Sequence, residues 1–363
     1  MRRVHVSLGE RSYDIRIGGG LIQRIGAECH KLGLGRRCAI VTDSNIPAWA
    51  VKTTTRSLKA AGFEVLTITL VAGEKSKNLS NVEKVFNQLA SHRLERKSFL
   101  IALGGGVVGD LTGYAAASYL RGIDFVQVPT TLLAQVDSSV GGKTGVNLKA
   151  GKNLVGAFHQ PRLVLCDTDI LKDLPDREYR SGIAEIIKYG IIYDARLFSR
   201  LEKDMNLLIA KDPKVISYVV ARSCEIKAAV VAEDEKEGGL RAILNFGHTI
   251  GHAIEAVSKY GKYLHGEAIS IGQVAAARLS EEVLSLPRKD SERIRALFEA
   301  TGLPVSMRMS KAVQERILAA TRLDKKVSGG VVKFVLAEKI GKVRFGLKVE
   351  ESLVHAELER IGS

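Results

Sequence analysis

Cysteine is scarce in this sequence of 363 residues, and its cysteines do not form closely spaced pairs. The four are Cys29, Cys38, Cys166 and Cys224, and no C-x-x-C spacing joins any two of them. A disulfide framework or a thiolate metal site needs regularly spaced cysteines, so both are excluded. The pattern indicates reduced, buried thiols and predicts a cytoplasmic protein.

The sequence also lacks a long uninterrupted apolar run. Its longest weakly polar stretch, 99–120, contains Asp110 and several glycines and has the character of a turn. A membrane-spanning helix needs about 20 consecutive apolar residues. The N-terminal segment MRRVHVSLGERSYDIRIG alternates like a strand and has no apolar core of a signal peptide. We therefore expect no membrane association.

Dense basic segments are missing as well, although the chain is basic. Lys and Arg number 54 against 40 Asp and Glu, a net charge of +14, yet no basic run exceeds two residues. A nucleic-acid arm is usually a denser basic stretch, so we expect no nucleic-acid partner. The excess positive charge still favours an anionic partner such as a phosphorylated or carboxylated metabolite, beside the plainer alternative of a basic solvated surface.

What the sequence does contain is a change of pattern near residue 175. Before it, helical stretches alternate with β-branched runs, and the expected strands are Val4–Leu8, Tyr13–Ile17, Cys38–Thr42, Val65–Leu70, Phe99–Leu103, Phe125–Val128 and Leu163–Cys166. This alternation predicts an α/β N-terminal domain with a mainly parallel sheet, residues 1–175. After it, helical spacing dominates, with a small hairpin over 331–345. Residues 176–363 are predicted to form a mostly α-helical C-terminal domain.

A glycine-rich loop follows one of the expected strands. Gly104, Gly106 and Gly109 satisfy G-x-G-x-x-G, where glycines let the backbone approach a pyrophosphate at a helix N-terminus. No acidic residue follows at the usual spacing, so a standard Rossmann arrangement is not indicated, and a tight turn without a ligand is the alternative. Asp43 and the segment 73–77 also follow strands. Because ligands bind at the carboxyl ends of parallel strands, the three segments together favour a dinucleotide.

The segment GGKT at 141–144 looks at first like a P-loop. That motif requires glycine at position 137, where Asp137 stands, so a P-loop is excluded. The loop containing Asp137 and Lys143, followed by Lys152 and Asn153, could instead hold a polar anionic metabolite. A solvated turn is the alternative.

Three of the eight histidines fall between residues 248 and 265. His248 and His252 are four residues apart, which places them on one face of a helix, and His265 follows. Imidazoles with a carboxylate are typical zinc ligands, and Glu185, one helical turn before Lys188, is the candidate carboxylate. Spacing alone nominates His248 and His252 as paired ligands, so the ligand set stays open, as does a structural role without metal.

Taken together, these motifs resemble the 3-dehydroquinate synthase family over nearly the whole chain. The most specific stretches are PTTLLAQVDSSVGGKTGVNLKAGKNLVGAFHQP (129–161), GIAEIIKYG (182–190), DEKEGGLRAILNFGHTIGHAIE (234–255) and DKKVSGGVVKFVL (324–336). The resemblance implies an N-terminal domain that binds NAD+ and a helical domain that binds Zn2+, with Co2+ as the other option. It implies Glu185, His248 and His265 as the metal ligands, which leaves His252 to act on the substrate.

The same resemblance implies two sets of binding residues. The implied NAD+ contacts are Asp43, Asn45, Glu74, Lys77, Gly105, Gly106, Val107, Val108, Gly109, Asp110, Thr130 and Thr131, with Asp137, Lys143 and Lys152. The implied substrate contacts are Arg121, Lys143, Lys152, Asn153, Lys227, Arg241, and Lys325 or Lys326. His252 is expected to relay protons with help from Asn245 and Asp137, and Lys188 is expected to hold an anionic group of the substrate.

A member of this family would convert 3-deoxy-D-arabino-heptulosonate 7-phosphate to 3-dehydroquinate and phosphate, a step of the shikimate pathway to aromatic amino acids. The implied course is transient oxidation by NAD+, phosphate elimination, re-reduction and intramolecular aldol closure. A substrate with a phosphate and a carboxylate suits the proposed cationic residues. We expect a cytoplasmic homodimer. The alternatives are another sugar phosphate cyclase, of the valiolone or deoxy-inosose type, and a metal-dependent polyol dehydrogenase that consumes NAD+.

Overall fold

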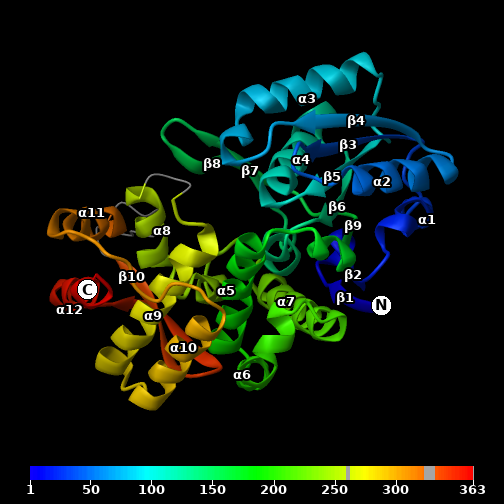
Figure 1. Ribbon diagram of the computed structural model, residues 1–363. Coiled ribbons are helices and arrows are strands. Elements are labelled where there is room, and N and C mark those ends of the chain that lie inside the picture. The colour runs from blue at the N-terminus through cyan, green and yellow to red at the C-terminus, as the bar shows by residue number, and fades with distance from the viewer. Residues whose placement is uncertain (259–261, 323–331, 363) are drawn as a thin grey trace. The chain divides into compact units, whose positions relative to one another are not determined.

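The computed structural model describes residues 1–258, 262–322 and 332–362 (Figure 1). By its internal packing the chain divides into two compact units. The first comprises Met1–Pro175 and Ile216–Ala232, and the second comprises Asp176–Val215 and Glu233–Ser363. The chain therefore leaves the first unit, begins the second, and returns to the first for one helix.

A seven-stranded sheet forms the centre of the first unit. Its strands are β1 (Arg2–Val6), β2 (Tyr13–Gly18), β3 (Arg37–Asp43), β4 (Glu64–Leu70), β5 (Phe99–Gly104), β6 (Asp124–Pro129) and β9 (Leu163–Asp167). Their spatial order is β1-β2-β9-β6-β5-β3-β4, and every pair is parallel except β1 with β2. Each of the seven expected strands overlaps a strand of this sheet, and only the first is shifted, since β1 begins at Arg2 and ends at Val6. The predicted fold class is confirmed.

Helices cover both faces of this sheet (Figure 1). They are α1 (Ile25–Lys31), α2 (Ala48–Ala60), α3 (Leu79–Ser91) and α4 (Gly106–Ser118). Alternate strand residues serve the two faces: Ala39 and Val41 pack with α3 and α4, whereas Cys38 and Ile40 pack with α1 and α2. Burial on both faces explains why β5 is apolar along its whole length.

Sequence reasoning missed a second, smaller sheet in the first unit. Strands β7 (Lys143–Leu148) and β8 (Gly151–Phe158) form an antiparallel hairpin where a polar loop was expected. The hairpin lacks a strong apolar signal because its strands pair only with each other and β8 has no buried residue. Just before it, Ala134–Ser138 forms a short π-helix, a geometry that is often found at functional sites.

Helix α7 (Pro213–Glu233) supplies the part of the first unit that comes late in the sequence. The thiol of Cys224 donates to the carbonyl oxygen of Gln135 at 3.3 Å. Lys227 Nζ donates to the carbonyl oxygen and to Oδ1 of Asp137, at 2.7 and 2.8 Å. The helix thus holds the π-helical turn from one side.

The second unit is mostly helical, as expected. Its helices are α5 (Asp176–Ile192), α6 (Ala195–Ile209), α8 (His248–Val257), α9 (His265–Leu284), α10 (Arg288–Ala300), α11 (Lys311–Arg322) and α12 (Glu351–Ile361), with a short 3-10 helix η7 (Leu240–Asn245). Strands β10 (Lys333–Lys339) and β11 (Lys342–Lys348) form the small hairpin. Helices α11 and α12 were not anticipated from the sequence.

Three helices of the second unit approach one another backbone to backbone. A Cβ added at Gly266 of α9 would lie 2.0 Å from the carbonyl oxygen of Ser181 in α5. One added at Gly272 of α9 would lie 2.1 Å from the carbonyl oxygen of Gly247, which precedes α8 and has φ +75°. Side chains cannot occupy these positions without moving a helix. Glycine therefore sets the spacing of α5, α8 and α9.

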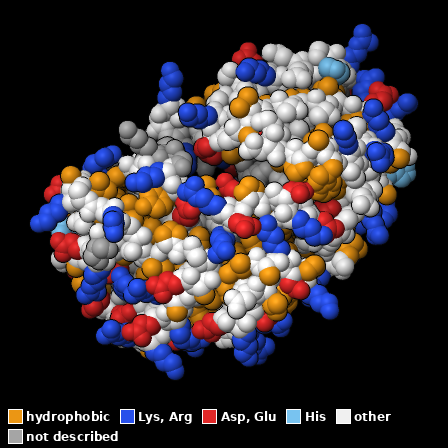
Figure 2. Space-filling model, in the orientation of Figure 1, with side chains coloured by type: hydrophobic (Ala, Val, Ile, Leu, Met, Phe, Trp, Pro, Cys, Tyr) orange, Lys and Arg blue, Asp and Glu red, His pale blue; other side chains and the backbone are white. Residues whose placement is uncertain are grey.

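The surface carries charge of both signs. Figure 2 shows Lys and Arg side chains interspersed with Asp and Glu on the face in view, rather than gathered into one patch. Within the described part of the chain, no helix has the length and apolar character that spanning a membrane requires.

We expect Gly272→Ala to lower the free energy of unfolding by about 1–3 kcal/mol or more, because the added methyl group would push α9 away from Gly247. Urea unfolding monitored by circular dichroism measures the loss. Gly238→Ala is the matched control, since the nearest atom to its added Cβ is 3.8 Å away. An unchanged stability of Gly272→Ala would show that this close approach does not hold the helices.

Candidate functional site

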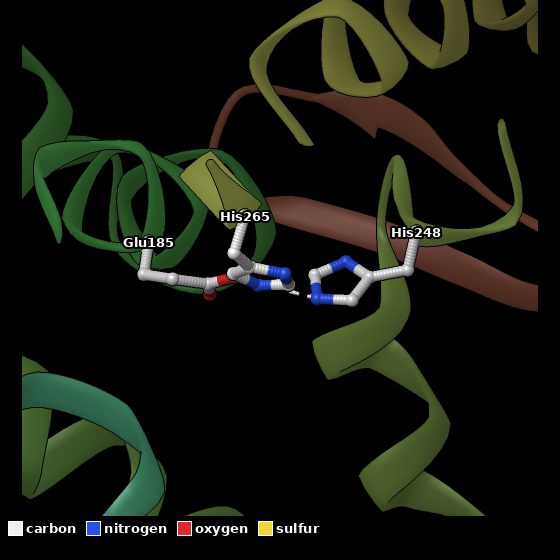
Figure 3. A group of neighbouring side chains, drawn as sticks. All are labelled: Glu185, His248 and His265. Atoms are coloured by element: carbon white, nitrogen blue, oxygen red, sulfur yellow. Dashed lines mark hydrogen bonds and ion pairs between the residues drawn. The ribbon is translucent and has the colours of Figure 1, made fainter. Parts of the chain in front are cut away.

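The close packing of α5 and α9 brings two predicted ligands together. Gly266 N donates to Ser181 Oγ at 2.9 Å, which fixes the first turn of α9 against α5. His265 is the first residue of α9, and Glu185 lies one helical turn after Ser181. Figure 3 shows that the two side chains point toward each other. Their ring Nε2 and carboxylate Oε1 are 3.2 Å apart.

The start of α8 supplies the third side chain. His248 is the first residue of α8, directly after Gly247. Its Nδ1 lies 3.0 Å from the carbonyl oxygen of Phe246, which can only accept a hydrogen bond, so Nδ1 carries the ring proton. The lone pair of the neutral ring is therefore on Nε2. That atom lies 3.3 Å from Glu185 Oε1 (Figure 3).

These three side chains form a compact donor set for a metal ion. One donor atom from each of Glu185, His248 and His265 lies within 4.8 Å of the others. Two ligand atoms bound to a tetrahedral zinc ion at 2.0–2.1 Å are about 3.3 Å apart, which the distances from Oε1 to both Nε2 atoms match. Two imidazoles and a carboxylate are also the donor chemistry of catalytic zinc sites. The residues present fit a divalent ion.

Charge within the group is balanced by a buried lysine. Lys188 is 1% exposed and forms an ion pair with Glu185, which is fully buried. Burial raises the pKa of Glu185, but Lys188 and His248 outweigh it and hold this pKa well below its ordinary value. Lys188 was expected to hold an anionic group of the substrate. The structure pairs it with a candidate metal ligand, and its role toward the substrate stays a prediction.

The two histidines differ in charge because their surroundings differ. Burial and the positive charge of Lys188 lower the pKa of His248. Burial also lowers the pKa of His265, but Glu185 and Glu255 outweigh it and raise this pKa to about 10. Without a metal ion, protonated His265 and Lys188 therefore supply the positive charge beside Glu185.

The histidine spacing left the choice of metal ligands open, and the structure narrows that choice without reducing it to one set. His252 lies one turn after His248, with ring centroids 5.1 Å apart. It belongs to a second group with Glu255 and His265, whose donor atoms also lie within 4.8 Å of one another. Sequence reasoning missed Glu255, although its position three residues after His252 places it on the same helical face.

Two other predicted residues of the second unit, Arg241 and Asn245, lie just before α8. Arg241 is 2% exposed, and its guanidinium donates to the carbonyl oxygen of Glu235 at 2.5 Å. Asn245 ends η7 and is half-buried. Lys325 and Lys326 lie outside the described residues.

In the first unit, the glycine-rich loop joins β5 to α4 as expected. The N-terminus of α4 follows Gly105, so the first N–H groups of the helix face the carboxyl end of the sheet. A Cβ at Gly106 would come within 3.1 Å of Ser138, and one at Gly105 within 3.2 Å of Thr131. Thr130 Oγ1 is buried and has no hydrogen-bond partner within the described ranges of the chain. A ligand hydroxyl or phosphate would satisfy it.

Lys77 links this loop to the β7–β8 hairpin. Its Nζ donates to Asp110 Oδ2 at 2.5 Å and to Asn153 Oδ1 at 2.6 Å. Burial raises the pKa of Asp110, and Lys77 opposes that rise. Glu74 Oε1 accepts from Asn147 Nδ2 at 2.7 Å, a contact that sequence reasoning did not anticipate. Asn153 N donates to Asn147 Oδ1 at 2.9 Å, so four predicted residues, Glu74, Lys77, Asp110 and Asn153, belong to one network.

The remaining predicted residues of the first unit are more dispersed. Asp43 ends β3, and its Oδ1 accepts from Asn45 N at 2.8 Å. Lys143 is exposed and Lys152 is half-buried, both on the hairpin. Arg121 follows the C-terminus of α4, the end of this 13-residue helix opposite the glycine-rich loop and about 20 Å from it. Lys227, another of the predicted cations, forms an ion pair with Asp137.

Comparisons with known proteins agree with this arrangement. Residues 67–181 match the family described as 3-dehydroquinate synthase N-terminal, and residues 182–327 match 3-dehydroquinate synthase C-terminal. A curated 3-dehydroquinate synthase from Nostoc punctiforme is 49% identical over 358 residues, which cover 98% of each chain. The chain belongs to the 3-dehydroquinate synthase family. A second curated 3-dehydroquinate synthase, from Nitrosomonas europaea, is 52% identical. The match covers 95% of this chain and 92% of that relative.

Solved structures of sugar phosphate cyclases share the fold at lower identity. 2-Deoxy-scyllo-inosose synthase complexed with carbaglucose-6-phosphate, NAD+ and Co2+ has a TM-score of 0.89, 26% identity and 99% coverage of both chains. The 2-epi-5-epi-valiolone synthase ValA of Streptomyces hygroscopicus subsp. jinggangensis 5008, with NAD+ and Zn2+ bound, has a TM-score of 0.88, 28% identity and 98% coverage of both. The identities favour 3-dehydroquinate synthase over these relatives, and the predicted family and enzyme class are confirmed.

We expect the metal-free protein to lose stability as the pH rises, because the folded-state pKa of His265 is about 10 against an ordinary 6.5. The stability that the charged ring contributes is full below pH 6.5 and is lost as the pH approaches 10. Chelator-treated wild type is expected to lose on the order of 2 kcal/mol more than His265→Gln between mildly acidic and mildly alkaline pH.

Urea unfolding across this pH range measures the difference between wild type and His265→Gln. His355→Gln, which removes an exposed histidine of α12, controls for the general loss of an imidazole. Parallel pH dependence in wild type and His265→Gln would contradict the charge assigned to His265.

Proposed function

We propose that the chain catalyses the conversion of 3-deoxy-D-arabino-heptulosonate 7-phosphate to 3-dehydroquinate and phosphate. The observation that carries the proposal is the donor group of buried Glu185, buried His248 and half-buried His265, in a chain about half identical to relatives of that name. The proposed nucleotide-binding part is 1–175, and the proposed metal- and substrate-binding part is 176–363.

We assign the donor group to a divalent ion, Zn2+ or Co2+, the ions bound in the two solved cyclases. Such an ion supplies a Lewis acid that lowers the pKa of a substrate hydroxyl. The chain prepares the site in advance, because the Phe246 carbonyl turns the lone pair of His248 Nε2 toward Glu185. Lys188 keeps Glu185 ionised in a buried position, as a carboxylate ligand must be.

We assign NAD+, the dinucleotide of both solved cyclases, to the carboxyl end of the sheet. NAD+ supplies a hydride acceptor that is regenerated within each turnover. The N-terminus of α4 offers N–H groups to its pyrophosphate, Thr130 Oγ1 offers a buried hydroxyl, and Asp43 offers a carboxylate to ribose hydroxyls. Lys77 holds Asp110 and Asn153 in place around this loop.

The anionic groups of the substrate require cations and amides. Lys143, Lys152 and Asn153 on the β7–β8 hairpin and Arg241 before α8 are the candidates that the structure describes. Lys227 neutralises Asp137, so its first task is to hold the π-helical turn. The roles of Arg121, Lys325, Lys326 and Asn245 stay predictions, as do the homodimer and the cytoplasmic location.

His252 is the candidate for proton transfer. It lies half-buried on α8, one turn after His248, so an imidazole stands beside the donor group. We propose that a ring nitrogen of His252 takes the proton of the substrate hydroxyl that is oxidised and returns it later.

The assay that tests the function follows phosphate release from the heptulosonate phosphate. We expect release to require NAD+ and to stop after chelation, because the hydroxyl is oxidised only with both groups bound. NADH is not expected to accumulate, since the hydride is returned. Net NADH formation would support a polyol dehydrogenase instead, and turnover of sedoheptulose 7-phosphate or glucose 6-phosphate would support another cyclase.

We expect His252→Ala to lower kcat about 100- to 10,000-fold while the bound metal is retained, because a general acid-base is lost but the donor group is intact. Kinetic assays and metal analysis of the same preparations measure the two effects. His248→Ala is expected to lose the metal, and His355→Ala neither metal nor activity. Full turnover by His252→Ala would exclude the relay.

A further inference from the structure

Both ring nitrogens of His265 face carboxylates. Nε2 lies 3.2 Å from Glu185 Oε1, inside the donor group, and Nδ1 lies 3.6 Å from Glu255 Oε2. A neutral imidazole carries one proton, and a metal binds the nitrogen that lacks it. For Nε2 to be a ligand, the proton must stay on Nδ1. Glu255 is the group placed to keep it there.

His248 provides the comparison within the same group. Its Nδ1 proton is held by the carbonyl oxygen of Phe246 at 3.0 Å, which no side-chain substitution removes. His265 has a side-chain carboxylate in the equivalent position. The separation of 3.6 Å is that of an ion pair and exceeds a good hydrogen bond, so the contact acts mainly through charge. Of the two histidine rings, only that of His265 faces a side chain that a mutation can replace.

The location of Glu255 suits this task. It lies on α8 seven residues after His248, two helical turns along the same face. Its side chain is only 14% exposed, and a carboxylate so far buried needs a positive or donating partner. Helix α8 thus carries one proposed ligand, His248, and the carboxylate that faces the ligand of α9.

We propose that Glu255 is a positioning residue: its carboxylate holds the Nδ1 proton of His265, so that the proton displaced when the metal ion binds is the one on Nε2. The proposal rests on the metal site of the proposed function. Groups that orient a metal-binding histidine typically contribute 10- to 100-fold to metal affinity. The cost of losing Glu255 falls on metal binding first and on turnover as a consequence.

The test measures Co2+ and Zn2+ affinity of the full chain by competition with a chelator, without substrate or NAD+. Glu255→Gln keeps the shape and loses the charge, and Glu255→Met loses the acceptor as well. We expect affinity to fall in the order wild type, Glu255→Gln, Glu255→Met, with the last about 10- to 100-fold weaker than wild type. Glu281→Met, the same change on α9 away from the group, is the control and is expected to bind like wild type.

A second measurement reports the tautomer directly. Nitrogen NMR of histidine-labelled protein with Zn2+ bound is expected to show, for His265, a zinc-bound Nε2 and a protonated Nδ1, and in Glu255→Met an Nδ1–H signal that is weakened by faster exchange with water because its acceptor is gone. A merely structural role would change unfolding and leave this signal in the folded, zinc-bound fraction. If Glu255→Met does not fold, Glu255→Gln against wild type decides.

The outcomes distinguish the positioning role of Glu255 from the proposed metal site on which it rests. Wild-type affinity in both Glu255 variants would overturn the positioning role, whereas failure of wild type itself to bind either ion would overturn the metal site. A second ion per wild-type chain, lost in Glu255→Gln, would make Glu255 a ligand of another site with His252. That result would also overturn the positioning role.

Discussion

Helices α5, α8 and α9 approach so closely that only glycine fits at their contacts. Gly266 lies against the backbone of Ser181, and Gly272 against that of Gly247. The donor residues sit within a turn of these contacts, at the first positions of α8 and α9 and one turn after Ser181 in α5. Their separation is therefore set by main-chain packing rather than by flexible side chains. Every property assigned to the group depends on that spacing.

The two units share a second feature: the candidate site in each contains a buried lysine paired with a carboxylate. Lys188 pairs with Glu185, Lys77 with Asp110, and Lys227 with Asp137. Removing either partner would leave an uncompensated buried charge, which is costly, so each pair fixes a geometry. Some of the lysines therefore hold the sites in shape and add nothing to the net charge, because each is cancelled by its carboxylate. The excess of basic residues cannot be read as a count of groups that contact an anionic ligand.

Features with strong local sequence patterns could be predicted from the sequence, and features without them could not. Strands such as β5 were predictable because burial on both faces makes them apolar throughout. The β7–β8 hairpin was not, since its exposed, glycine-containing strands look like a loop. Spacing favoured His248 with His252, because only neighbours on one helix are visible in a sequence. Glu185 and His265 join His248 through tertiary contacts, so the residues offered them only as candidates and the family resemblance was needed to select them. Glu255 was missed although it lies on the same helical face as His252.

The return of α7 to the first unit has a consequence for protein synthesis. The seven-stranded sheet is complete in sequence by Asp167, but residues 216–232, which hold the π-helical turn, come later. At about 5–20 residues per second, a ribosome needs roughly 3–11 seconds to pass from residue 175 to residue 232. During that interval the Gln135 and Asp137 carbonyls lack their partners from α7. The nascent first unit must wait for a segment encoded beyond the start of the second.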